Sequence, residues 1–148
     1  MCWRKKITLK CGCTLDKRKI AGLPTDQNHN AALDIFIDEC KNKLMSENLL
    51  LAVLKKITIE WWNDIAPSPS TGVLNTVVTY GDQVYSGLTT DHLCRVAWRG
   101  KLYRSAFVHE LLHVIGGDIL GDPDPNHQNQ TLKDLEGSIN SRLAQVDL

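Results

Sequence analysis

The segment Ser105-Ala-Phe-Val-His-Glu-Leu-Leu-His-Val-Ile-Gly-Gly117 places three titratable side chains in an otherwise apolar run. Residues 106–115 are apolar apart from His109, Glu110 and His113, which predicts a helix over residues 105–115 that is buried on most of its surface. We expect Ser105 to cap this helix and the glycine pair at 116 and 117 to end it. Buried imidazoles and a buried carboxylate are costly without partners, so this helix needs something that satisfies all three.

The spacing of these groups is that of a metal site. His109 and His113 are four residues apart, so on a helix they project from one face about one turn apart, where two imidazoles can reach one ion. Glu110 lies beside them and can point at an open coordination position as a general base, in the H-E-x-x-H arrangement. The alternative is a pair of core histidines bonded to backbone, with Glu110 in solvent. This alternative requires a separate partner for each of the three side chains, whereas one metal ion and one water molecule satisfy all three.

The same segment resembles the active-site helix of the zincin metallopeptidases, most strongly over residues 102–127. The resemblance implies a zincin-like α+β fold in which a strand at the cleft edge, here residues 92–98, lies antiparallel to the substrate. It also implies a zinc-dependent peptidase in which Glu110 activates a zinc-bound water and Zn²⁺ polarises the scissile carbonyl. The chain is not an orthodox metzincin, because Ile119 stands where that group has a histidine and no methionine follows the motif.

A catalytic zinc site needs a third protein ligand, and the residues after the motif offer several. His127 is the first choice, because imidazole is a common zinc ligand and a loop stiffened by Pro123 and Pro125 is long enough to return it to the site. Glu136, on the expected final helix, is the second, in the place of the third ligand of gluzincin-like enzymes. Aspartates are the remaining candidates, as in aspartate-type zincins: Asp118, Asp122 and Asp124.

Apolar spacing elsewhere predicts one α+β domain over residues 1–148, with N-terminal helices, a small and mostly antiparallel sheet, the active-site helix and a C-terminal helix. The expected helices are residues 31–45, residues 46–56 with Ser46 as the cap, and a last helix from Thr131 with Asp134 in a capping box. The expected strands are residues 7–10, 57–62 and 92–98, with a hairpin of residues 73–80 and 83–85.

Composition narrows the classes of function. The 148 residues include 17 basic and 17 acidic side chains, and a net charge of zero argues against a general nucleic-acid or membrane-surface binder. The longest apolar run, residues 49–54, is too short to span a membrane, and without a readable export signal we expect a cytoplasmic protein. Five scattered cysteines predict reduced thiols with Cys40 and Cys94 buried, and a Cys40–Cys94 pair is the alternative.

Three functions are consistent with these residues. The first is a zinc peptidase acting on a peptide or protein, with Glu110 as the base and three histidines as ligands. The second is a metal-dependent endoribonuclease-like hydrolase, because the pattern from His109 to Asp118 resembles the motif of a bacterial endoribonuclease family, although Glu110 replaces a glycine there. The third is a non-catalytic binding module in which the metal staples the fold, a kind of site that commonly uses four protein ligands. The oligomeric state stays open.

Overall fold

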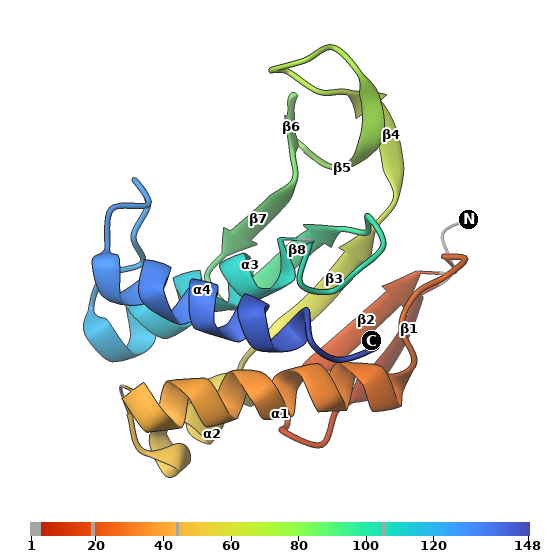
Figure 1. The fold of residues 1–148 in the computed structure, drawn as a ribbon. Helices are drawn as coiled ribbons and strands as arrows, with labels where there is room; N and C mark the ends of the chain where they lie inside the picture. The colour runs from red at the N-terminus through yellow and green to blue at the C-terminus, as the bar shows by residue number, and fades with distance from the viewer. Residues whose placement is uncertain (1–3, 19, 44, 105) are drawn as a thin grey trace.

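The computed structural model describes residues 4–18, 20–43, 45–104 and 106–148 as an α+β fold (Figure 1). The larger sheet has the order β1-β2-β3-β8-β7 and consists of β1 (Arg4–Thr8), β2 (Thr14–Arg18), β3 (Thr58–Trp62), β8 (Leu93–Ala97) and β7 (Gly87–Thr90). The smaller sheet consists of β4 (Asp64–Pro67), β5 (Leu74–Tyr80) and β6 (Gln83–Tyr85). The helices are α1 (Asp26–Lys43), α2 (Glu47–Leu54), α3 (Phe107–Ile115) and α4 (Gln130–Leu143), with a π-helical turn, η1 (Gly116–Leu120), after α3.

The larger sheet is mixed. Its outer pairs, β1–β2 and β7–β8, are antiparallel, whereas its inner pairs, β2–β3 and β3–β8, are parallel. The smaller sheet is antiparallel in both of its pairings. The expected α+β class is confirmed, and antiparallel pairs are the majority in the described part of the chain. The parallel centre was not predicted, because it depends on long connections: α1 and α2 join β2 to β3, and the smaller sheet with β7 joins β3 to β8.

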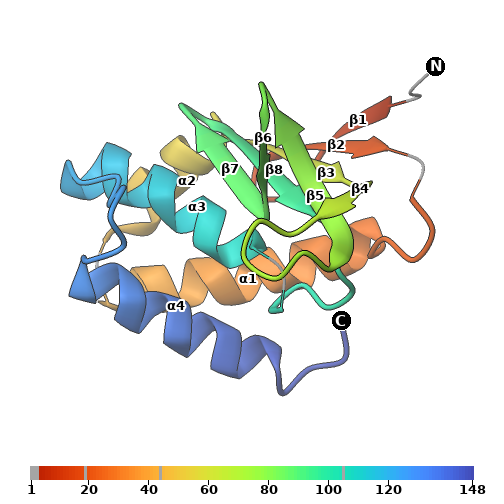
Figure 2. The ribbon, with the colours of Figure 1, turned by 90° about the horizontal axis from the view of Figure 1, so that it is seen from above.

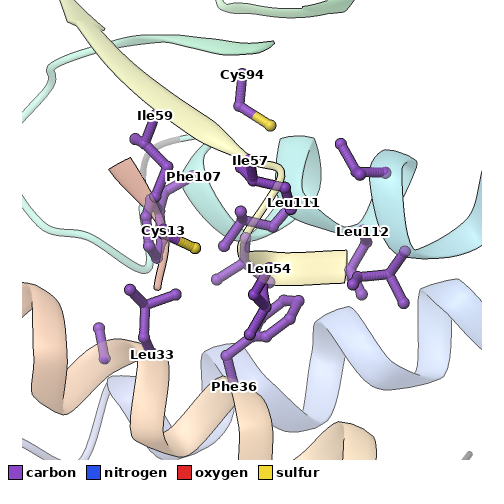
Figure 3. Packing of buried hydrophobic residues seen from close by; sticks show 14 of the residues in the cluster. Cys13, Leu33, Phe36, Leu54, Ile57, Ile59, Cys94, Phe107, Leu111 and Leu112 are labelled. Carbon is purple, nitrogen blue, oxygen red and sulfur yellow. The ribbon is translucent and has the colours of Figure 1, made fainter. Parts of the chain in front are cut away.

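The core lies between the larger sheet and the helices. Ile59 and Trp61 alternate toward the interior along β3, and the register sets them beside Cys94 and Val96 of β8, which are also buried. Figure 2 shows α1, α3 and α4 gathered on one side of this sheet. In Figure 3 side chains of the strands meet those of α1 and α3, among them Phe36. The helix that carries the candidate site is therefore part of the main core.

The N-terminal caps predicted for α2 and α4 can be compared with the structure. Ser46 accepts a hydrogen bond from the backbone N–H of Leu49, so the predicted cap of α2 is confirmed. The predicted start of the last helix is wrong: α4 begins at Gln130, and Asn129 is its cap, accepting from the backbone N–H of Leu132. Asp134 instead accepts from the Gln130 side chain, on the helix surface. The predicted apolar face of α4 is buried at four positions: Leu132, Leu135, Ile139 and Leu143.

The predicted cap at Ser105 lies outside the described residues, and α3 is described from Phe107. The predicted hairpin is confirmed as β5 and β6, and the strand over residues 92–98 as β8. No helix among residues 4–18, 20–43, 45–104 and 106–148 combines the length and the apolar character that a membrane crossing requires.

The cysteines outside the first three residues are free thiols. Cys13, Cys40 and Cys94 are buried, and Cys11 is partly exposed. Burial raises the pKa of Cys40 and that of Cys94 to about 12, so both are neutral, apolar core residues. The reduced state was predicted, and the alternative Cys40–Cys94 pair is wrong.

The smaller sheet projects from the body of the molecule (Figure 1), and β6 leads into β7 through Ser86. Ser86 is tied to the segment that follows β8. Its carbonyl accepts from the backbone N–H of Ala97 at 3.0 Å, and its hydroxyl accepts from the Arg99 guanidinium at 2.9 Å. The chain is thus fastened at the point where it passes from one sheet to the other.

His29 of α1 is a fully buried histidine between two fixed partners. Its Nδ1 lies 2.9 Å from the carbonyl oxygen of Thr25, and its Nε2 accepts from the indole N–H of Trp61 at 2.9 Å. A carbonyl only accepts and an indole only donates, so the ring is neutral with its proton on Nδ1. Burial lowers the pKa of His29.

We expect this histidine to make the fold less stable in acid. The folded chain keeps His29 neutral, so the unfolded chain binds the proton first. Stability present above about pH 6.5 is therefore lost below it, by at most about 1.4 kcal/mol per pH unit. Urea unfolding of the wild type and of His29→Gln, at about pH 7.5 and about pH 5.5, measures the effect. The variant should show the smaller pH dependence, because glutamine does not titrate, and equal dependence would contradict the assignment.

Candidate metal centre

Helix α3 buries most of its side chains and leaves His109 and His113 partly exposed on one face. The two residues are one helical turn apart, and their rings meet edge to face with centroids 4.7 Å apart. Their Nε2 atoms are separated by 3.1 Å. The predicted convergence of the two imidazoles is therefore present in the fold.

The other nitrogen of each ring has an acceptor. His109 Nδ1 lies 3.0 Å from a carboxylate oxygen of Glu136, and His113 Nδ1 lies 2.6 Å from the carbonyl oxygen of Pro123. Both Nδ1 atoms are therefore donors, and each Nε2 is left as the atom that can offer a lone pair. Two lone pairs at this separation repel unless a proton or a cation lies between them.

These donors fit a transition-metal ion. Metal-binding histidines generally donate their second ring N–H to a carboxylate or a backbone carbonyl, and His109 and His113 show one of each. A tetrahedral zinc with bonds of about 2.0–2.1 Å holds its ligand atoms about 3.3 Å apart. The 3.1 Å between the two Nε2 atoms is close to that value.

The hydrogen bond between His109 Nδ1 and Glu136 shifts the pKa of both groups. The hydrogen bond with Glu136 raises the pKa of His109, and the same bond lowers the pKa of Glu136. The raised pKa favours the protonated form of His109, and the lowered pKa favours the charged form of Glu136. A ring made more basic in this way is a stronger ligand once its Nε2 has lost its proton. Glu136 therefore orients the His109 ring through Nδ1 and leaves Nε2 facing the site.

His127 completes a group of three histidines. One ring nitrogen from each of His109, His113 and His127 lies within 4.8 Å of the others. The His127 ring stacks on that of His109, with centroids 4.8 Å apart, and meets that of His113 at 5.0 Å. The first-choice third ligand is therefore brought to the other two by the fold.

The loop that carries His127 is held by two aspartates. Asp124 is buried, and its Oδ1 accepts two backbone N–H groups at 2.7 and 2.9 Å. Asp122 accepts the side-chain amide of Asn129 and the backbone N–H of Asp124, each at 2.8 Å, and these bonds lower the pKa of Asp122. Within this turn His127 adopts a left-handed conformation with φ of 56°. Its position is thus defined by the hydrogen bonds of the loop.

The chain reaches this loop through η1, where the prediction of a helix end at the glycine pair is wrong. Helical structure continues to Leu120, and the left-handed residue that ends it is Gly121, with φ of 69°. Gly116 accepts the backbone N–H of Asp122 at 2.9 Å, and a Cβ at Gly116 would collide with the Asp122 carbonyl. The missing side chain at Gly116 therefore permits a close backbone approach instead of ending the helix.

The other candidates for the third ligand have different partners. Asp118 lies 2.7 Å from His92 Nε2, at the end of the β7–β8 turn. Asp122 and Asp124 bind loop N–H groups, and Glu136 binds the outer nitrogen of His109. Among the described residues, the potential metal ligands that gather at this point are the three histidines.

Glu110 points from α3 toward strand β7 and is buried rather than in solvent. Its Oε1 accepts the hydroxyl proton of Thr89 at 2.8 Å, and its Oε2 lies 4.0 Å from His109 Nε2. One oxygen is therefore bonded to the sheet, and the other is on the side of the histidines.

A cleft of about 810 Å³ opens above the three histidines and Glu110. Its second wall is β7, the edge strand of the larger sheet, and not β8 as the sequence predicted, because β8 is paired on both sides. The charged residues that line the cleft, apart from the histidines, are acidic: Asp91, Glu110 and Asp118. The cleft is thus an acidic groove with an edge strand along one wall.

Sequence reasoning missed the residues that orient the site. Thr89 lies on a four-residue strand, Gly-Leu-Thr-Thr, with no alternation that predicts it. The Pro123 carbonyl carries no side-chain signal. Glu136 was a candidate ligand, and its place one bond away from the histidine nitrogen follows only from the packing of α4 on α3.

A comparison of the chain with models of known families, with curated proteins and with solved structures finds no match.

Proposed function

We propose that this protein is a zinc-dependent peptidase whose metal ligands are His109, His113 and His127. The observation that carries the proposal is the facing pair of Nε2 atoms, 3.1 Å apart, on rings whose Nδ1 atoms are both engaged as donors. A third imidazole and a buried carboxylate border the same point, at the floor of an open cleft. A purely structural histidine pair would explain the two Nδ1 bonds, but not two Nε2 atoms that face each other at the floor of a cleft.

The metal ligands, Glu110 and strand β7 would each have a separate role in peptide hydrolysis. When bound, zinc would supply a Lewis acid that polarises a carbonyl and lowers the pKa of water. Glu110 accepts the proton of the attacking water and then returns it to the amine nitrogen as the C–N bond breaks. The free edge of β7 offers backbone N–H and C=O groups that can hold an extended peptide along the cleft.

The charge of the cleft favours a peptide over a nucleic acid. Asp91, Glu110 and Asp118 line it, and its described lining contains no lysine or arginine. Protein surfaces that bind RNA or DNA contact the phosphates with basic groups, and the described lining of this groove offers a phosphate chain none besides the histidines and the proposed ion. The endoribonuclease-like alternative lacks the electrostatic support it needs.

The experiment is metal loading coupled to an assay of hydrolysis. Purified protein is stripped with a chelator and titrated with Zn²⁺ while cleavage of fluorescent casein is followed. We expect one zinc per chain, loss of cleavage in chelator and its return with zinc. His113→Gln should bind far less zinc, whereas His92→Gln, outside the three-histidine group, should still bind one ion per chain.

The other outcomes identify the alternatives. Stoichiometric zinc without cleavage of casein or of a mixed peptide library points to the stapled module. Zinc-dependent cleavage of single-stranded RNA in place of peptides points to the endoribonuclease-like hydrolase. A chain that takes up no transition metal contradicts all three functions.

A further inference from the structure

Two residues of strand β7, Gly87 and Thr89, lie against the Glu110 carboxylate. They are two positions apart, so both face the same side of the strand, toward α3. Neither belongs to the H-E-x-x-H pattern. Their contacts with the carboxylate are close enough to determine its orientation.

Thr89 occupies one oxygen of the carboxylate. Its hydroxyl lies 2.8 Å from Glu110 Oε1 and 3.2 Å from the backbone carbonyl oxygen of the same residue. A hydroxyl has one proton to donate, and the shorter contact to a charged acceptor is the stronger bond. Oε1 is therefore bonded, while Oε2 remains on the side of His109, 4.0 Å from its Nε2.

Gly87 leaves the space that the carboxylate fills. A Cβ at this position would lie 2.8 Å from Glu110 Oε2 and 2.9 Å from its Cδ, and 2.8 Å from the Cβ of Ala106. Real Cβ atoms do not approach other atoms so closely, so any side chain here would displace the carboxylate. The strand thus bonds one oxygen of the Glu110 carboxylate and leaves room for the other.

We infer that Thr89 is a positioning residue that selects Glu110 Oε2 as the oxygen that accepts the proton. The inference rests on the proposed peptidase function. Without the hydroxyl, the carboxylate is free to rotate about its terminal bond, which is a soft torsion, and Oε2 is no longer held toward the site. Misplacement of a catalytic group by about 1 Å can cost about 100-fold in rate, whereas substrate binding along the strand is unaffected.

The test compares Thr89→Val, which has the same shape without the hydroxyl, with Thr89→Ser, which keeps the hydroxyl. Zinc content, kcat and KM are measured for each with a fluorogenic peptide that the wild type cleaves. We expect Thr89→Val to lose about 10- to 100-fold in kcat with KM and zinc content unchanged, and Thr89→Ser to recover most of the loss. Gly87→Ala cannot replace this test, because its Cβ would also lie 2.8 Å from the Cβ of Ala106 and would displace the strand as well as the carboxylate.

The results distinguish the positioning role of Thr89 from the proposed peptidase function. If the wild type cleaves peptides and Thr89→Val has the same kcat, or if Thr89→Ser is as slow as Thr89→Val, the positioning role is overturned while the peptidase function stands. If the zinc-loaded wild type cleaves no peptide, the proposed function fails and the inference fails with it.

Discussion

Replacement of Glu110 by glutamine is expected to lower kcat for peptide hydrolysis by about 100- to 10,000-fold while the protein still binds one zinc ion. Glutamine has the same shape, and its amide oxygen can still accept the Thr89 hydroxyl. It cannot take a proton at neutral pH, so the variant lacks only the base. Because Glu110 is outside the group of three histidines, the proposed metal ligands are unchanged.

Zinc content by elemental analysis and kcat from initial rates measure the two halves of this prediction. Glu47→Gln is the matched control, since Glu47 is an exposed residue in the first turn of α2 and the chemical change is the same. It should leave both quantities at the wild-type level. A Glu110→Gln enzyme as fast as the wild type would contradict the role of Glu110 as base.

Gly116→Ala is expected to have the largest effect on stability, a loss of about 1–3 kcal/mol in the free energy of unfolding. The added methyl would collide with the Asp122 carbonyl and lie 2.8 Å from Leu132 Cδ1. The carbonyl belongs to backbone that is tied by the Asp122 N–H bond to Gly116, so it cannot yield cheaply. The strain is passed to the loop that carries His127, and zinc affinity should fall as well.

Gly137→Ala is the control for that substitution. Gly137 lies in α4 with no atom within 4 Å of its added Cβ, so alanine should stabilise the helix by about 0.4–1 kcal/mol. Urea unfolding of both variants gives the comparison. Equal stability of Gly116→Ala and Gly137→Ala would show that the close approach at Gly116 is unimportant.

The parts of the fold that the sequence predicted are those set by local spacing. Apolar residues at helical intervals located α3 and the buried face of α4, and Gly81-Asp82 located the β5–β6 hairpin. Likewise, the interval between His109 and His113 was enough to place their rings together, whatever ion they hold. Local patterns carry such information because one element contains both partners.

The parts that were missed depend on contacts between distant segments. Strand β7 is short and exists through its pairing with β8, and η1 continues past Gly116 because Asp122 folds back onto it. The cap of α4 was misplaced by two residues, since Asn129 supplies what a local capping pattern had assigned to Thr131. The assembly of His127 with α3 depends on the loop hydrogen bonds of Asp124, which no spacing rule contains.

The two hydrogen bonds of Ser86 bear on the shape of the cleft. The residue is anchored on its main chain by Ala97 and on its side chain by Arg99, directly before β7 begins. Arg99 also donates to the carbonyl oxygen of Thr76 in β5, so one guanidinium holds both the smaller sheet and the residue before β7. Because Tyr85 of β6 and Ser86 line the cleft, this anchor also sets one end of the groove.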